Sequence, residues 1–526
     1  MIRKAERDGL IQGVERTAPP ISHLLFADDT LIYCHALADA IHCIQHILLA
    51  FEKASSLMIN LRKSAVVFSR NVEVRLQQDL VGILGVEVVP KHDKCLGLPM
   101  VSGRSKKELF ASIKDRMWSK IQSWSTKHLS QAGRAVLIKM VLQTIPSYAM
   151  SCFQMPDSFI RELESALADF LWHGGEASKI HWKAWSKLCK PRKEGGLGFR
   201  LLKEHNLALL AKQAWRIAFH TGSSLHNVIS HRYFPGSTFL EARLGSRPSY
   251  TWWSIWNARD LLAAGIRWKI GNGRCVPILG QPWLPRPRTF QLQQAPVSLP
   301  SDCKVSALMS PADGWNEALI RAEFCSDDAV CILDIKLPGA DSRDELVWHY
   351  GSNGSFSVNS AYSLAVELNN DGACSQTGAS WSYIWNSKAI PKVMLFGWRC
   401  VQEALPMSVN LRRKGIPVAD GCVHYSETQE DILHVLVLCC FARLVWAVSG
   451  LPGDAVRCPT TSVEGWFRRT HGNLSRSEWK LFLSICWALW RARNSCIFDG
   501  KRFEAHEIVG LARRIGGDCA DVLMHG

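Results

Sequence analysis

The chain has 526 residues, which suggests about three domains, and hydrophobic residues make up 47% of it, enough for globular cores. Its formal net charge of +15 favours a polyanionic partner such as RNA or DNA. No run of 18 apolar residues is present, so no membrane span is expected, and the first ten residues lack the apolar core of a signal peptide.

The 18 cysteines are spread along the chain, and no two of them have C-x-x-C spacing. Cysteines that form disulfides are a feature of secreted proteins, whereas this chain shows no secretory signal. We therefore predict an intracellular protein, nuclear or cytoplasmic, whose thiols are reduced and mostly buried.

Residues 21–36 (ISHLLFADDTLIYCHA) place Asp28 and Asp29 between two apolar runs, a pattern that predicts a β-hairpin. A helix from about Leu37 to Ala54 and a strand near 65–69 follow. Two adjacent aspartates are often only a solvated turn, because carboxylates accept hydrogen bonds from nearby amides. The alternative is a Mg²⁺ site, since paired ions held by carboxylates stabilise the attacking and leaving oxygens in phosphoryl transfer.

The densest basic stretch coincides with a predicted helix, whose apolar positions are Leu109, Ile113, Met117 and Ile121. The basic groups fall largely off this apolar face. They are Arg104, Lys106, Lys107, Lys114, Arg116 and Lys120. This surface is either simply solvated or follows a nucleic-acid backbone in the manner of a polymerase thumb.

Residues 23–29 (HLLFADD) resemble the catalytic hairpin of reverse transcriptases, in the form typical of plant LINE-type (non-LTR) retrotransposons. Further blocks resemble that family in the family's order: 55–64 (SSLMINLRKS), 94–99 (KCLGLP), 129–134 (LSQAGR), 145–148 (IPSY) and 195–200 (GGLGFR). Two of these blocks depart from the usual pattern, with Ser56 in place of Gly and Cys95 in place of Tyr.

The resemblance implies that Asp28 and Asp29 are catalytic Mg²⁺ ligands and that Lys63 lies near the phosphates of the incoming nucleotide. Lys63 is otherwise an ordinary solvated lysine. The resemblance also implies that Leu96 and Gly97 belong to the primer grip and contact nucleic acid.

The resemblance implies that a complete polymerase of this family has a further catalytic aspartate on an earlier strand, together with fingers and a nucleotide-binding segment, all before the hairpin. The acidic residues before the hairpin are Glu6, Asp8 and Glu15, and they lie in a polar stretch without a strand pattern. We therefore expect an interior fragment of a retrotransposon polyprotein, with no polymerisation by this chain alone.

A second constellation near the C-terminus resembles the zinc-binding domain that follows the reverse transcriptase in these elements. The residues that match its ligand pattern are Cys422, His434 and Cys439, and the block 354–358 (GSFSV) supports the match. Structural Zn²⁺ takes four N or S ligands, but Tyr425 stands at the second ligand position. His424 or Cys440 would have to complete the site, and three ligands alone would bind more weakly. Otherwise these cysteines and the histidine are ordinary interior residues.

Residues 487–494 (WALWRARN) resemble the helical connector that precedes a ribonuclease H domain in related elements, although a plain amphipathic helix has the same pattern. The chain also holds 21 tryptophans, many of them in local clusters. Tryptophans among basic residues can stack on unpaired bases, but we favour core packing, because buried aromatic rings cover large areas.

We therefore predict an α+β chain with a truncated polymerase palm hairpin, a mainly helical thumb or connection region and a small C-terminal zinc-binding-like domain. The predicted parts are a palm remnant (1–75), helical thumb/connection (76–220), irregular linker (221–340), zinc-binding-like domain (341–450) and helical connector (451–526).

The predicted function is that of a fragment of a non-LTR retrotransposon reverse transcriptase (an RNA-directed DNA polymerase), inactive alone and at most binding RNA or DNA. Mg²⁺ would bind if the polymerase site were completed, and Zn²⁺ is the candidate structural metal. Two alternatives stay open. One is an enzyme whose missing aspartate comes from another chain or an upstream exon, and the other is a host-retained interaction protein that uses the zinc-binding domain as a scaffold.

Overall fold

The computed structural model describes residues 1–13, 20–90, 94–95, 98–99, 106–174, 180–286, 288–310, 314–338, 342–369, 381–418, 421–424, 430–457 and 462–521. The chain forms two compact units. Unit 1 comprises Met1–Phe110, Tyr148–Gln154 and Asn206–Asn369, and unit 2 comprises Ala111–Ser147, Met155–His205 and Asn370–Gly526. In the described residues helices dominate and every sheet has two strands, so the predicted α+β class is confirmed in its coarse form.

The N-terminal part of unit 1 contains the predicted hairpin. Strands β1 (His23–Phe26) and β2 (Asp29–Ile32) pair antiparallel, with Phe26 opposite Asp29. The turn consists of Ala27 and Asp28, and Ala27 has a positive φ of 51°, which a two-residue hairpin turn requires and which glycine adopts more easily.

Helices next to this hairpin build a small core from Ile11, Ile41, Ile44 and Leu80. The elements of this part are α1 (Ile2–Arg7), α2 (Ala38–Ser55), β3 (Ala65–Val66), α3 (Val74–Leu84), β4 (Glu87–Val88), β5 (Lys94–Cys95) and β6 (Leu98–Pro99). Helix α2 confirms the helix predicted from about Leu37 to Ala54, and β3 covers the start of the predicted strand.

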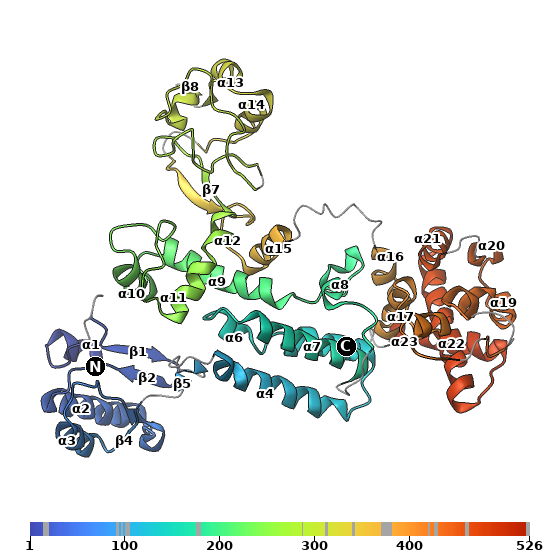
Figure 1. Cartoon of the computed structure of the whole chain (residues 1–526), viewed down its shortest axis with the longest axis horizontal. Helices are drawn as coiled ribbons and strands as arrows, with labels where there is room; N and C mark the ends of the chain where they lie inside the picture. Colours follow the sequence, from blue (N-terminus) through green and yellow to red (C-terminus); the bar gives the residue numbers. More distant parts are fainter. Residues whose placement is uncertain are drawn as a thin grey trace. The chain divides into compact units, whose positions relative to one another are not determined.

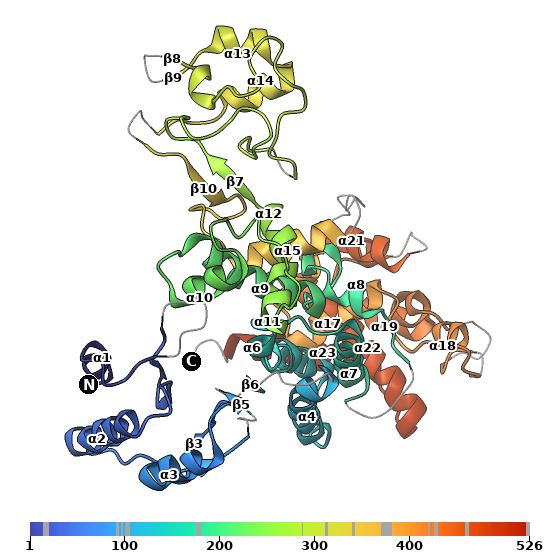
Figure 2. The same ribbon diagram turned by 60° about the vertical axis from the view of Figure 1, so that its left-hand side comes forward.

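The rest of unit 1 forms two further cores, one around Trp252 and Trp348 and one around Trp283. Its elements are α10 (Ser224–Tyr233), α11 (Tyr250–Asn257), α12 (Arg259–Ala263), β7 (Ile266–Lys269), β8 (Met309–Ser310), β9 (Gly314–Trp315), α13 (Glu317–Glu323), α14 (Ser326–Leu333), β10 (Glu345–Trp348) and α15 (Val358–Asn369). Strands β7 and β10 pair antiparallel, and Figure 2 shows them leading to the lobe of α13 and α14.

The stretch 221–340, interpreted from the sequence as an irregular linker, contributes residues to both of these cores. The stretch is rich in Gly, Pro and isolated tryptophans, which hide any helical or strand period. Apolar residues far apart in this stretch, such as Ile270 and Ile332, nevertheless meet in one buried cluster, which periodicity along the chain cannot reveal.

Unit 2 begins with a region that is mainly helical. Its helices are α4 (Lys106–Ser125, from Ala111 on), α5 (Gln131–Leu137), a π-helical turn (Ile138–Leu142), α7 (Asp157–His173), α8 (Trp185–Cys189) and the start of α9 (Leu202–Phe219), with the short α6 (Ser147–Met150) at its edge. On α4, Ile113, Met117 and Ile121 are buried, which confirms the apolar face predicted from their spacing; the side chain at 109 lies outside the described residues.

The C-terminal part of unit 2 is helical and shares one core around the rings of Trp466, Phe467, Trp479 and Phe482. Its helices are α16 (Ser382–Trp385), α17 (Pro391–Val401), α18 (Ser408–Arg413), α19 (Cys440–Ala447), α20 (Gly453–Val456), α21 (Val463–Asn473), α22 (Arg476–Asp499) and α23 (Ala505–Asp521). Helix α22 packs against α17 and α23, drawn in orange and red in Figure 1.

A glycine turn links the two parts of unit 2. The carbonyl oxygen of Gly195 accepts hydrogen bonds from the indole of Trp398 at 2.8 Å and from the amide of Gln402 at 3.0 Å. Next to this contact, Arg399 donates to the side chain of Gln131 at 3.0 Å. Two of the family-like blocks, 129–134 and 195–200, are therefore the places where helix α17 docks.

In the described residues no helix combines the length and the apolar character that crossing a bilayer requires. The five predicted parts and their boundaries stay predictions.

The docking turn yields a stability prediction. A Cβ at Gly196 would lie 2.0 Å from the carbonyl oxygen of Lys190, so Gly196→Ala forces the backbone apart. We expect the free energy of unfolding to fall by about 1–3 kcal/mol, the cost of overpacking. Gly472→Ala in α21, where a Cβ meets nothing within 4 Å, is the control and should stabilise by up to about 1 kcal/mol. Denaturant unfolding of unit 2 measures both, and equal stability of the two variants would contradict the prediction.

Candidate functional site

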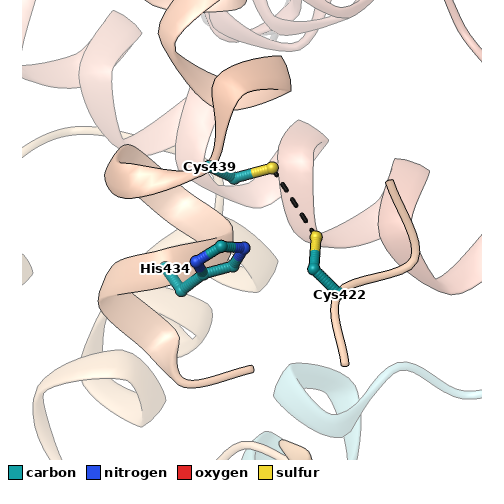
Figure 3. Close-up of side chains that lie close together, drawn as sticks. All are labelled: Cys422, His434 and Cys439. Carbon is teal, nitrogen blue, oxygen red and sulfur yellow. Dashed lines mark hydrogen bonds between the residues drawn. The ribbon is translucent and has the colours of Figure 1, made fainter. Parts of the chain in front are cut away.

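Three side chains that sequence comparison pairs with zinc ligands lie together in unit 2. The ligand atoms of Cys422, His434 and Cys439 all lie within 4.8 Å of one another, and among the described residues they form the one group of three or more such side chains (Figure 3). Cys422 and Cys439 are buried, and His434 is half-buried.

A π-helical turn explains how His434 and Cys439 face the same point. In an α-helix, residues five apart differ in direction by about 140°. Residues His434–Leu438 form a π-helical turn instead, and the amide of Cys439 donates to the carbonyl oxygen of His434 at 2.8 Å. This wider turn, a geometry that is frequent at functional sites, places the two ligands on one side.

The spacing of the sulfurs fits a zinc ion. With Zn–S bonds of about 2.3 Å, two thiolates at the corners of a tetrahedron lie about 3.8 Å apart. The Sγ atoms of Cys422 and Cys439 are 3.7 Å apart, well beyond the bond length of a disulfide, and both cysteines are free. Two thiolates and a neutral imidazole are also the donor types that Zn²⁺ prefers, so these residues fit the metal.

Local electrostatics bear on the thiol of Cys439, which immediately precedes α19. Burial raises its pKa to about 11, with a further contribution from Cys422. The backbone amides of Phe441 and Ala442, at the start of the helix, donate to the sulfur and lower the pKa. These amides would therefore support a metal-bound thiolate, as helix N-termini do for cysteine generally.

A cavity of ≈ 10 Å³ adjoins the cluster and is lined by Cys422, His424, Glu430, Cys439 and Arg493, among others. This volume is about that of a single water-sized probe, so the space suits one ion or water. Glu430 and Arg493 form a buried ion pair, with 2% and 12% of their side chains exposed. The carboxylate accepts from both Nε, at 3.1 Å, and a terminal nitrogen of Arg493.

This ion pair is the part of the site that sequence reasoning missed. The block 487–494 contains Arg493, but its pattern pointed to a connector helix, not to the zinc-binding segment. The sequence signal is limited to an acidic residue, Glu430, between two predicted ligands. That its carboxylate is buried, and so requires a cationic partner, is visible only in the structure.

The candidates for a fourth ligand differ in their surroundings. Cys440 is exposed, and Tyr425 lies outside the described residues. The ring of His424 stacks on Phe441, with centroids 4.5 Å apart, and its amide donates to the sulfur of Cys422 at 3.4 Å. Burial lowers the pKa of His424, as does the charge of Arg502, while Glu430 raises it.

The predicted catalytic residues lie in unit 1, and their side chains do not form a metal-binding cluster with other described residues. Asp28 sits in the hairpin turn and Asp29 begins β2, and both are exposed. Lys63 is exposed on a 3₁₀ turn, Leu61–Lys63, and in the described residues no ion pair joins it to either aspartate. Among these residues no third His, Cys, Asp or Glu completes a metal-binding group with Asp28 and Asp29.

Residues before the hairpin do not supply a strand-borne carboxylate. Glu6 lies in helix α1, and Asp8 ends it. Glu15 lies outside the described residues.

The predicted nucleic-acid residues fall into three classes. Leu96 and Gly97 lie outside the described residues, and Lys106 and Lys107 begin α4 with side chains that are not described. Lys114 forms an ion pair with Glu162 at 3.0 Å. Arg116 and Lys120 are exposed on the same helix.

Comparison with known proteins agrees with this geometry. Residues 356–446 match the family described as zinc-binding in reverse transcriptase, and this span includes all three clustered ligands. An Arabidopsis thaliana protein provisionally named a ribonuclease H protein is 29% identical over 419 residues, which cover 76% of this chain and 66% of that protein.

Two further relatives match shorter stretches. An uncharacterized mitochondrial protein of Arabidopsis thaliana is 44% identical over 142 residues, 27% of this chain and 92% of that protein. An uncharacterized 149 kDa protein of transposon TX1 from Xenopus laevis is 26% identical over 176 residues, 33% of this chain and 13% of that protein. The chain thus spans about two thirds or less of the length of two of the three relatives.

These matches define a retroelement-derived protein with a reverse transcriptase zinc-binding domain. The chain belongs to the reverse transcriptases of plant LINE-type (non-LTR) retrotransposons and corresponds to the C-terminal region of that family.

The buried ion pair next to the cluster generates a stability prediction. Arg493→Met leaves Glu430 buried without a counter-charge, so we expect unfolding free energy to fall by about 3–5 kcal/mol. Replacing both partners, in Glu430→Met/Arg493→Met, should recover most of that loss, because no uncompensated charge remains. Denaturant unfolding of the three proteins forms the test, and a double variant as unstable as the single one would contradict it.

Proposed function

We propose that this reverse-transcriptase-derived chain is a nucleic-acid-binding protein that does not polymerise alone and whose zinc site is structural. The observation that carries the proposal is uncompensated positive charge on helix α4 of a chain with a net charge of +15. Such charge attracts phosphate backbones of RNA or DNA without reading their sequence.

Fewer cations on α4 are available to a polyanion than the sequence alone implies. The charge of Lys114 is offset by Glu162, so this lysine contributes little to the field. Arg116 and Lys120 are one helical turn apart, are exposed and form no ion pair with any described residue. They are the pair on this helix that we assign to phosphate contacts.

A second group of cations in unit 2 adds to the field. Lys183 and Lys187 lie near Lys414, whose Nζ donates to the carbonyl oxygen of His181 at 3.4 Å. Burial lowers the pKa of Lys183, and the charges of Lys187 and Lys414 lower it further against the opposing effect of Glu403. Cations that repel one another in this way favour a bound polyanion.

Zinc would act as a cross-link in unit 2. Cys422, His434 and Cys439 would hold it, and the ion would supply folding free energy by joining the loop at 421–424 to the π-helical turn. With side-chain donors surrounding it, a structural zinc ion carries no reacting water.

The catalytic part of the proposal rests on the hairpin. Two adjacent carboxylates in water repel each other, and holding two Mg²⁺ ions needs further acidic ligands or substrate phosphates. The described residues offer no third carboxylate at Asp28 and Asp29, so we assign no polymerase activity to this chain by itself. A further strand supplied by another polypeptide would complete an active enzyme.

Salt dependence tests the nucleic-acid proposal. For Arg116→Gln/Lys120→Gln, the magnitude of the slope of log affinity against log salt for single-stranded RNA should fall by about 1.4, or about 0.7 per lost phosphate contact. The control Lys114→Gln/Glu162→Gln removes an ion pair without changing net charge and should leave the slope unchanged. Fluorescence anisotropy titrations of labelled RNA at several salt concentrations, from low to physiological, measure this slope. Affinity that is independent of salt, or absent, contradicts the proposal and favours the scaffold alternative.

Primer extension tests the absence of polymerisation. The purified chain, given Mg²⁺, deoxynucleotides and a primed RNA template, should incorporate no more nucleotide than Asp28→Asn/Asp29→Asn does. Incorporation by the native chain that this double variant lacks would overturn the proposal.

A further inference from the structure

The candidate zinc site has three clustered side chains, whereas structural Zn²⁺ takes four ligands. Structural Zn²⁺ is almost always tetrahedral, with N or S ligands from the protein. Cys422, His434 and Cys439 account for three positions. The residue that fills the fourth must be near the cavity and must have a free donor atom.

Two nearby donors are poorly placed for this role. Cys440 is exposed and is the first residue of α19, whereas Cys439, the residue before it, is buried in the cluster. Glu430 lines the cavity, but its carboxylate is already bound by two nitrogens of Arg493. Using Glu430 as a zinc ligand would disturb its ion pair with Arg493.

His424 has the free atom. Its ring lines the same cavity as Cys422, Glu430 and Cys439. Its Nε2 is buried and has no hydrogen-bond partner among the described residues. A buried nitrogen without a partner loses its hydration and gains nothing in return, unless a proton donor or a metal ion reaches it.

The backbone around His424 is already arranged for a metal site. The amide of His424 donates to the sulfur of Cys422 at 3.4 Å, which ties the backbone at 424 to one of the three clustered side chains. The ring stacks on Phe441, with planes at 22°. His424 is not among the three side chains whose ligand atoms lie within 4.8 Å of one another, so its side chain would have to move toward them to bind the same ion.

We propose that the imidazole of His424 is the fourth zinc ligand of this chain, in the place of residue 425. This inference rests on the proposed structural zinc site. It makes the donor set two thiolates and two imidazoles, which is one of the common sets of structural zinc. The ion with these ligands is electrically neutral, which suits a half-buried site.

Zinc affinity of four full-length proteins tests the proposal. Native chain, His424→Gln, Cys440→Ser and His424→Gln/Tyr425→Cys are titrated with Zn²⁺ against a competing chelator. We expect His424→Gln to bind more than about 100-fold more weakly, beyond the loss typical of an outer-shell partner. Cys440→Ser, the matched control, should bind as the native chain does, and the double variant should regain affinity because a thiolate takes the fourth position.

Cobalt substitution provides a readout of the ligands themselves. Co²⁺ in the native chain should give the intense visible bands of four-coordinate tetrahedral geometry and charge-transfer absorption from two thiolates. His424→Gln should lose the tetrahedral bands, and the double variant should regain them with charge transfer from three thiolates. Recovery in the double variant also shows that glutamine at position 424 is compatible with the folded site.

The outcomes separate this inference from the proposed function. A native chain that binds no Zn²⁺ overturns both the structural zinc site and its ligand. If the native chain and His424→Gln bind Zn²⁺ with equal affinity, the assignment of His424 as the fourth ligand is wrong, but the structural zinc site stands. Loss of affinity in Cys440→Ser likewise overturns the assignment, because the fourth position would then belong to Cys440.

Discussion

The carbonyl oxygen of Gly195 is the point on which the arrangement of unit 2 depends. It accepts hydrogen bonds from Trp398 and Gln402, which lie about one helical turn apart on α17, more than 200 residues further along the chain. A carbonyl oxygen with two donors is fully satisfied, so the helix cannot shift without leaving buried polar groups unpaired. Gly195 has a positive φ of 86°, which favours glycine, and a Cβ there would lie 2.9 Å from the ring of Trp381. Both the backbone conformation and the available space therefore require glycine at this position.

The candidate metal site depends on this docked helix through the common core. Helices α17 and α22 pack together, and α22 presents Arg493 to the buried Glu430 beside the cysteines. The zinc-binding segment and the helices after it therefore share one hydrophobic core, and the ion pair between Glu430 and Arg493 also joins them. A metal ion in the cluster would add a cross-link between segments that the core already brings close.

The hairpin with Asp28 and Asp29 contrasts with this well-packed site. Leu24, Leu25 and Phe26 lead into the turn with about half or more of their surface exposed. Consecutive apolar residues on both faces are the pattern of a strand buried on both sides, and a two-stranded hairpin alone is marginally stable. The apolar pattern of this hairpin is thus typical of a larger sheet than the two strands that the described residues form.

Local patterns in the sequence determined the helices with clear apolar spacing and the hairpin turn, because period and residue type are properties of neighbours in the chain. The resemblance to a known family pointed to Cys422, His434 and Cys439, which the structure brings together. Only the tertiary structure decided that Lys114 is neutralised by Glu162, that residues 221–340 hold cores of their own and that Arg493 belongs beside the metal ligands. It also decided that a π-helical turn, and not an α-helix, aligns His434 with Cys439. Each of these depends on groups distant in sequence or on a backbone register that neighbouring residues do not specify, and such contacts form only when the whole core packs.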